Sequence, residues 1–245
     1  MRLASLTPLL LLPFFALAEP SAENLQTMRY LAFSAGSHLL LYYNPNQIDS
    51  DPRFAERYHH DLQRLQQLVV MAGDPALEQI SDQLAREVAE LESQPKSDAQ
   101  LRPLWINPIL QTHATLDQMA QKRYTPLSSK GGARLTIDRL SLDVQRLLLL
   151  YQTRTFSSLG VYIDEIKEGA PETLDQRITE GFSELARTQS QSVGEIAKLR
   201  RMYEFVRPRL LRLELGAVPG GAAYYLAQIG DGLTLLSEQE LRDTQ

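Results

Sequence analysis

The stretch RLLLLYQTRTFSSLGVY, residues 146–162, begins as an apolar run and then becomes small and polar. Around it, apolar or small side chains recur every three or four residues, the spacing that places them on one face of an α-helix. The sequence therefore predicts one long helix that carries this face. Its stripe consists of Leu140, Val144, Leu147, Tyr151, Thr155, Leu159, Tyr162 and Ile166.

A second stretch, RYLAFSAGSHLLLYY at residues 29–43, has the same order of arginine, apolar run, small residues and tyrosine. Alternating strand patterns are nearly absent from the chain, and Leu, Ala, Gln, Glu and Arg, which favour helices, far outnumber Val and Ile. The predicted fold class is all-α, an elongated antiparallel helical bundle.

The two stretches indicate an internal repeat. Arg29 and Arg146 are 117 residues apart, and Pro52 and Pro171, each at the start of an amphipathic segment, are 119 residues apart. Two duplicated helical hairpins with short extra helices would give this pattern, and so would two unrelated amphipathic hairpins; both interpretations stay open. Two long hairpins close most easily into an up-down four-helix bundle. In layout alone, this resembles the helical-bundle sensor domains of bacterial chemoreceptors and sensor kinases.

Capping residues and prolines mark the predicted helix ends. Asp51 before Pro52 and Asp74 before Pro75 are typical helix starts. Gly73 is a typical helix end, so one helix should stop there and the next should begin at once.

The segment TPLSSKGGA, residues 125–133, has the composition of a flexible connection. We expect a flexible joint at residues 126–132 between an N-terminal helical half, residues 19–125, and a C-terminal helical half, residues 133–245. The two halves can form one bundle. The segment GAVPGG, residues 216–221, predicts the end of the last long helix before a short final one.

The first residues, MRLASLTPLLLLPFFALAEP, indicate export. One charge at Arg2 precedes an apolar run, which ends in small residues as at the site that a signal peptidase cuts. We expect a signal peptide, residues 1–18, that is cleaved between Ala18 and Glu19, and a soluble mature chain that is periplasmic or secreted. The apolar run is shorter than the roughly 20 residues that span a bilayer. An uncleaved membrane anchor is the alternative, and no transmembrane span is predicted in the mature chain.

The 245-residue chain contains no cysteine and carries a formal net charge of −5. Disulfides, cysteine nucleophiles and attached c-type haem are therefore excluded, and the fold must depend on the burial of apolar side chains. An acidic chain is a poor candidate for general nucleic-acid binding. No cofactor is predicted.

Glu56 and His59 have the Glu-x-x-His spacing of di-iron carboxylate bundles. Such a site needs a second Glu-x-x-His motif, and the four histidines of the chain do not supply one. The sequence also lacks a Gly-x-Ser-x-Gly nucleophile elbow and a phosphate-binding P-loop. It therefore predicts no metal site and favours a protein that is not an enzyme.

Two segments of small residues, AFSAGS at 32–37 and TRTFSS at 153–158, interrupt the apolar stripes. Small residues at such places either let helices approach closely or leave room for a ligand between helices. The nearby polar residues that would bind a small anionic ligand are Arg29, His38, Arg146, Arg154 and Ser158.

A basic strip lies near the end of the last predicted long helix. Cations there can complement the helix dipole, or they can form a docking surface for an anionic partner or for lipid headgroups. The strip consists of Lys198, Arg200, Arg201, Arg207, Arg209 and Arg212.

Taken as a whole, the sequence favours an exported helical-bundle protein of the cell envelope that works by binding, as a sensor-like or accessory module. The first alternative is a structural module that binds partner proteins through extended helical faces. A helical-bundle metalloprotein or enzyme is a more distant alternative. The pattern of residues names neither the ligand, the partner nor the oligomeric state.

Overall fold

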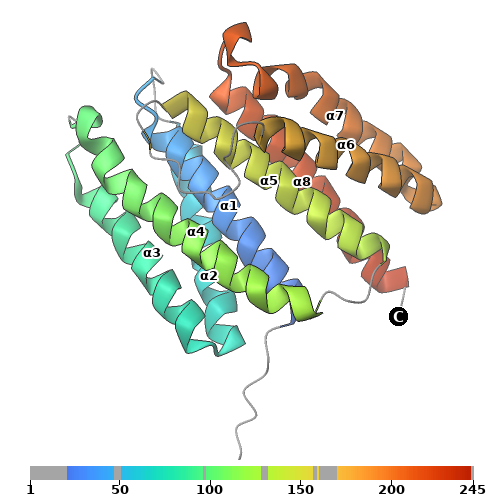
Figure 1. Ribbon diagram of the computed structural model, residues 1–245, viewed down its shortest axis with the longest axis horizontal. Helices are drawn as coiled ribbons and strands as arrows, with labels where there is room; N and C mark the ends of the chain where they lie inside the picture. The colour runs from blue at the N-terminus through green and yellow to red at the C-terminus, as the bar shows by residue number, and fades with distance from the viewer. Residues whose placement is uncertain are drawn as a thin grey trace, which may run out of the picture.

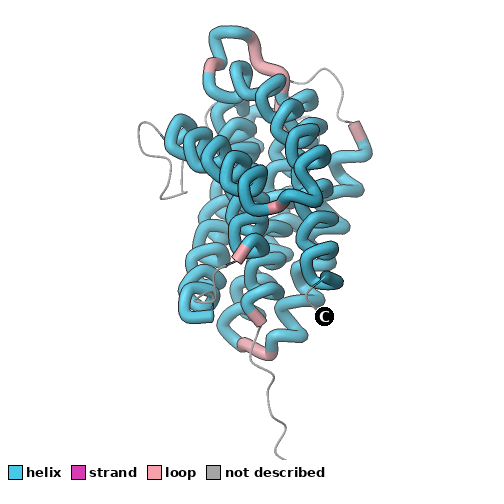
Figure 2. The backbone as a smooth tube through the Cα atoms, turned by 90° about the vertical axis from the view of Figure 1, so that its right-hand side faces the viewer, coloured by secondary structure: helices cyan, strands magenta, loops and turns pink. Residues whose placement is uncertain are grey.

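The computed structural model describes residues 21–46, 51–95, 98–127, 132–156, 159 and 170–243. These residues form helices and connecting turns, with no strand among them, which confirms the predicted all-α class (Figures 1 and 2). Three short 3-10 helices accompany the α-helices. The α-helices are α1 (Ala22–Tyr43), α2 (Pro52–Ala72), α3 (Pro75–Ser93), α4 (Arg102–Leu127), α5 (Ala133–Phe156), α6 (Ala170–Thr188), α7 (Val193–Leu211) and α8 (Pro219–Asp243).

The helices form two groups of four. In the first bundle, α1 and α3 each pack against α2 and α4, and in the second bundle, α5 and α7 each pack against α6 and α8. The two bundles are joined where α1 packs against α5, so these two helices lie side by side in the centre of the molecule (Figure 1). In Figure 1, α4 and α6 lie toward the viewer, whereas α2 and α8 lie behind the central pair.

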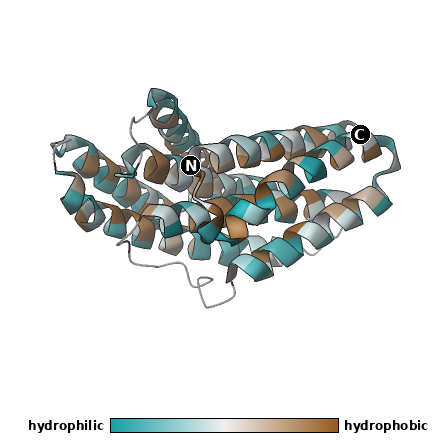
Figure 3. Cartoon of the chain, turned by 90° about the horizontal axis from the view of Figure 1, so that it is seen from above, coloured by the Kyte–Doolittle hydropathy of each residue, from teal (hydrophilic) through white to brown (hydrophobic). Residues whose placement is uncertain are grey.

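Burial follows from this arrangement. Because α1 packs against α2, α4, α5 and α8, most of its residues from Leu25 to Leu41 are buried. The peripheral helices bury one stripe each, and hydrophobic and hydrophilic bands alternate along them (Figure 3). Each bundle has its own apolar core, and Leu41 and Val144 belong to the core of the second bundle. The two helices that contain the apolar runs of the quoted stretches, α1 and α5, are therefore the most deeply buried helices of the fold.

The second bundle repeats the helix order of the first. For three of the four helix pairs, equivalent core residues are 117 positions apart, as in the pairs Leu65 and Phe182 of α2 and α6, and Leu116 and Leu233 of α4 and α8. The same spacing separates the two arginines that first indicated a repeat. The core residues of α3 and α7 correspond at 119 positions instead, as in the pairs Leu77 and Ile196, and Leu91 and Leu210. With this shift of two residues, the correspondence covers four helices in each half rather than a single hairpin.

The predicted helix boundaries at residues 51–75 are confirmed. The Asp51 carboxylate accepts the Arg53 backbone N–H at 3.0 Å and thereby caps α2. Gly73 ends α2 with a φ of 60°, a left-handed conformation that glycine adopts without strain. Asp74 then caps α3 by accepting backbone N–H groups at 3.0 and 3.2 Å.

The long helix predicted around residues 146–162 is shorter than expected, because α5 ends at Phe156 and Leu159 is not helical. Near this end, the Thr153 hydroxyl donates to the Leu149 carbonyl at 2.8 Å, and the Thr155 hydroxyl donates to the Gln152 carbonyl at 3.0 Å. Such bonds compete with the helical ladder. The remainder of that predicted helix lies outside the described residues.

Two further boundary predictions are wrong. The final helix is long, because Pro219 and Gly220 stand in the first turn of α8, where proline is tolerated, instead of interrupting the chain. The predicted joint begins too early, since residues 126 and 127 still belong to α4. Residues 128–131 of the joint lie outside the described part, as do residues 1–20 with the predicted signal peptide.

Candidate functional site

The predicted arginines Arg29 and Arg146 meet around one carboxylate. Asp117 of α4 accepts a hydrogen bond from Arg29 Nε at 2.5 Å and another from Arg146 Nη2 at 3.3 Å. Arg29 Nη2 also donates to Gln121 Oε1 at 3.0 Å. The side chains of Arg29, Arg146 and Asp117 are only 4 %, 9 % and 12 % exposed. The chain's own carboxylate therefore occupies the position that a small anion was expected to take.

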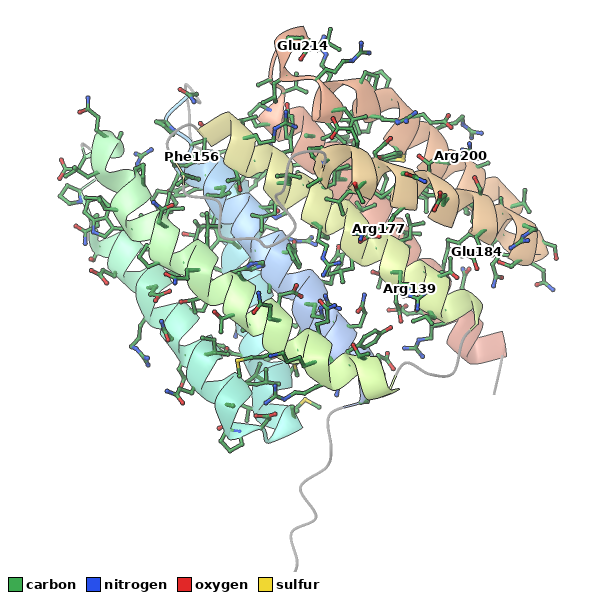
Figure 4. The ribbon with its side chains drawn as sticks, viewed as in Figure 1. Arg139, Phe156, Arg177, Glu184, Arg200 and Glu214 are labelled. Atoms are coloured by element: carbon green, nitrogen blue, oxygen red, sulfur yellow. The ribbon has the colours of Figure 1, made fainter. Side chains whose placement is uncertain are left out.

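This ion-pair network continues into the second bundle. Arg146 Nη1 lies 3.6 Å from Asp143 Oδ1, and the same oxygen accepts a hydrogen bond from Arg177 of α6 at 2.8 Å (Figure 4). Burial raises the pKa of Asp117, but the hydrogen bond and charge of Arg29 and the charge of Arg146 outweigh it, so that the pKa lies below its ordinary value. The network joins the two bundles on the side of α4 and α6.

The other residues of the predicted anion site do not join this network. His38 is buried on α1, where its Nδ1 lies 2.7 Å from the Ser34 carbonyl oxygen, and burial lowers its pKa. Arg154 is exposed in the last turn of α5. Ser158 lies outside the described residues. The five predicted residues therefore do not form one pocket.

The first small-residue segment makes a close helix contact. A Cβ atom on Gly36 would lie 3.3 Å from Leu149 of α5, so the backbone of α1 approaches that helix closely. Ala32 and Ala35 are buried in the core of the first bundle. At this place the small residues serve the contact between the bundles.

Five residues of the basic strip lie on α7, and Arg212 directly follows the last residue of this helix. Arg207 points toward α6 and binds Asp175 through two hydrogen bonds of 2.6 Å. Arg200 and Lys198 form ion pairs within α7, with Glu204 at 2.8 Å and Glu195 at 3.6 Å (Arg200 is labelled in Figure 4). The three remaining cations of the strip, Arg201, Arg209 and Arg212, are exposed.

Aromatic side chains lie beside these exposed arginines. Phe205 is 70 % exposed between Arg201 and Arg209, and its ring centroid is 5.0 Å from that of Tyr225 on α8. Tyr224, which precedes Tyr225 in the chain, is 61 % exposed. Arginine and aromatic residues are enriched in protein interfaces, so the composition of this surface is typical of one.

A cleft with a volume of about 540 Å³ lies between the two bundles. It is lined by α1 and α2 of the first bundle and by α5 and α8 of the second. It therefore lies on the side of the central α1–α5 contact opposite to the ion-pair network. We call it the inter-bundle cleft.

One end of the inter-bundle cleft contains Asp61, Arg57 and Asp231. Asp61 of α2 is buried and accepts hydrogen bonds from the Ser34 hydroxyl at 2.6 Å and from Arg57 Nε at 3.3 Å. Arg57 also reaches α8, where its Nη2 lies 3.6 Å from Asp231 Oδ1. His60 Nδ1 lies 3.3 Å from the second oxygen of Asp61. This group connects the two bundles across the cleft.

The other end contains Asp138, Arg134 and Glu23. Arg134 of α5 binds Glu23 of α1 at 2.8 Å and lies 4.0 Å from Asp138. Burial raises the pKa of Asp138 to about 6, against the opposing charge of Arg134. The carboxyl group of Asp138 is thus largely desolvated, and its nearest cation, Arg134, lies closer to Glu23 than to Asp138.

Tyr30 of α1 also lines the inter-bundle cleft, and burial raises its pKa, so that its hydroxyl stays neutral. This hydroxyl accepts a hydrogen bond from Gln145 at 3.4 Å. A Cβ atom on residue 230 of α8 would lie 2.5 Å from the Tyr30 oxygen. Gly230 is therefore needed inside a long helix to accommodate Tyr30.

Within the described residues, no group of three acidic, histidine or cysteine side chains is placed to hold a metal ion. His59 of the Glu-x-x-His motif lies 2.6 Å from Glu92 of α3. Among the described helices, none has an apolar stretch of the length and hydropathy that a membrane span requires. Comparison of the chain with known protein families, with curated proteins and with solved structures found no match.

None of the charged residues that line the inter-bundle cleft is among the site residues predicted from the sequence. One signal for it was present, because Asp61 stands between Tyr58 and Leu65 on the buried stripe of α2. A carboxylate at a core position of a helix needs a partner or a site, since an isolated charge is costly to bury. The partners of Asp61 come from α1 and α8 and could not be read from its own helix.

Proposed function

We propose that the protein is an exported binding protein of the cell envelope and that its small-molecule ligand occupies the inter-bundle cleft. The observation that carries this proposal is the cleft itself, whose volume of about 540 Å³ lies in the range of about 300–1,000 Å³ of ligand pockets. Polar side chains from four helices converge on it. A ligand that contacts both bundles would also stabilise their relative position, as expected of a sensor-like or accessory module.

Filling the inter-bundle cleft should abolish ligand binding. Thr234 of α8 lines the cleft and is exposed, so the variant Thr234→Trp adds a large side chain there without overpacking a core. We expect metabolite-sized compounds that bind the wild-type protein to raise its melting temperature. At a ligand concentration of a hundredfold excess over Kd, the free energy of unfolding should increase by about 2.7 kcal/mol. This gain should disappear in Thr234→Trp.

Thr115→Trp on α4 is the matched control. Thr115 is also exposed, and its hydroxyl donates to the Gln111 carbonyl at 3.0 Å, as the Thr234 hydroxyl donates to the Gly230 carbonyl at 3.0 Å. The control should keep the ligand-dependent gain in melting temperature. If compounds stabilise Thr234→Trp as strongly as the wild-type protein, binding in the cleft is contradicted.

Export is the second part of the proposal. The first described helix is capped by Ser21, whose hydroxyl accepts the Asn24 backbone N–H at 3.1 Å, and it begins after the expected cleavage site. Removal of residues 1–18 would leave α1 and its cap complete. Mass spectrometry of the protein from its native cells should find a chain that begins at Glu19. An intact chain in the membrane fraction would contradict export with cleavage.

A further inference from the structure

Each end of the inter-bundle cleft contains two carboxylates around one guanidinium group. At one end, Arg57 lies between Asp61 and Asp231. At the other end, Arg134 lies between Glu23 and Asp138. One arginine neutralises one of the two acids, so each end keeps an excess of one negative charge.

The remaining charged groups of the cleft do not remove this excess. Arg64 of α2 and Glu238 of α8 also line it, and their charges cancel. Among the lining residues that the structure describes, His60 and Tyr30 are the only other titratable side chains. With His60 neutral, the described lining residues together have an excess of two negative charges.

The two acidic ends are separated along α8. Asp231 belongs to the end with Arg57, whereas Ser237 hydrogen-bonds Asp138 at the other end. Six residues of α-helix, at about 1.5 Å per residue, place the two ends about 9 Å apart. A ligand that neutralises both ends must carry positive charge at two places with a comparable spacing.

We propose that the inter-bundle cleft binds small organic cations that carry two or more amino groups, such as linear polyamines. One ammonium group hydrogen-bonds Asp138 beside Glu23, and a second hydrogen-bonds Asp231, whose side chain is 59 % exposed beside Arg57. This inference rests on the proposed function, because it assigns a ligand class to the same cleft. An anionic ligand would add charge to a cleft that already has an acidic excess, whereas the buried arginines are paired with Asp117 and Asp143 elsewhere.

Asp138 is the main anchor of this proposal. Its side chain is 21 % exposed, and its closest cation, Arg134, is 4.0 Å away and bound to Glu23. An ammonium group in the cleft would provide the charged hydrogen-bond partner that the protein itself supplies only weakly. Charge-assisted hydrogen bonds of this kind are short and strong in a desolvated site.

Isothermal titration of the full mature chain with spermidine tests the proposal, with putrescine as a shorter diamine and with citrate and glucose as anionic and neutral probes. We expect spermidine to bind more tightly than putrescine and the other two probes not to bind. Asp138→Asn and Asp231→Asn should each weaken spermidine binding by about tenfold or more. Asp82→Asn on the exposed face of α3 is the control for non-specific attraction and should bind as the wild-type protein does.

Lowering the pH through about 6 should also weaken spermidine binding, more in the wild-type protein than in Asp138→Asn, because Asp138 loses its charge there. Equal affinities of the wild-type protein, Asp138→Asn and Asp231→Asn would overturn the proposal. The proposal would also be overturned if the wild-type protein did not bind spermidine, while another compound raised the melting temperature of the wild-type protein but not that of Thr234→Trp. That last outcome would leave the proposed function standing, whereas insensitivity of every ligand to Thr234→Trp would contradict both.

Discussion

Replacing Asp117 by alanine should destabilise the protein by about 3–5 kcal/mol, because two buried arginines then lose their shared partner. Arg29 and Arg146 are 4 % and 9 % exposed in their side chains, so water cannot replace the carboxylate without opening the contact between the bundles. For a chain of this size, the loss corresponds to a melting temperature lower by about 10 °C. Urea unfolding followed by circular dichroism would measure it.

The matched control is Asp82→Ala on α3, an exposed aspartate whose removal should change stability by no more than about 0.5 kcal/mol. Because the pKa of Asp117 lies below its ordinary value of 3.8, the stability that this group contributes is present above that pH. It is lost as the pH falls through the lower pKa of the folded state. An Asp117→Ala protein as stable as Asp82→Ala at neutral pH would show that the network contributes nothing.

Replacing Asp138 by asparagine should have the opposite effect and stabilise the protein at pH 7.5 by on the order of 2–3 kcal/mol. The pKa of Asp138 is about 6 in the folded chain and 3.8 when the group is in water. A difference of this size corresponds to about 3 kcal/mol, since each pKa unit is worth about 1.4 kcal/mol. The amide has no charge to desolvate, so the variant avoids this cost.

The pH dependence fixes the sign of this prediction. A raised pKa in the folded state means that the wild-type protein gains stability from protonated Asp138 below pH 4 and loses it as the pH rises through about 6. The groups that face Asp138 are Arg134 on α5, Glu23 on α1 and Ser237 on α8. Unfolding at pH 4.5, 6 and 7.5 should show an advantage of Asp138→Asn that grows with pH. A constant difference between the two proteins would contradict the assigned burial.

The fold class could be predicted because it depends on local patterns. Helical periodicity and caps such as Asp51 and Asp74 act within a few residues, and both caps are confirmed. The last helix was wrongly predicted because Pro219, Gly220 and Gly221 resemble a break in the chain. Gly230 is required by Tyr30, which is 200 positions away, and this contact has no local signal.

The candidate site depends on the packing of two bundles and could be predicted only in part. Arg29 and Arg146 were noticed because they are equivalent residues of the repeat, but their shared partner Asp117 comes from α4. Periodicity identifies the buried face of one helix and does not identify the helix that packs against it. The cleft acids Asp138 and Asp231 lie on polar faces of α5 and α8. They line the inter-bundle cleft only because α1 of the first bundle packs against α5.

The order of the helices along the chain has a consequence for assembly. All four helices of the first bundle precede all four of the second, so the chain crosses between bundles once, between Leu127 and Ala133. Two copies could therefore exchange their second bundles and remake every contact between α1 and α5, with two complete clefts per dimer. Such a domain-swapped dimer would keep the contacts within each bundle and between the bundles. Protein concentration during folding would then decide how many clefts each particle contains, while the affinity of each cleft would stay the same.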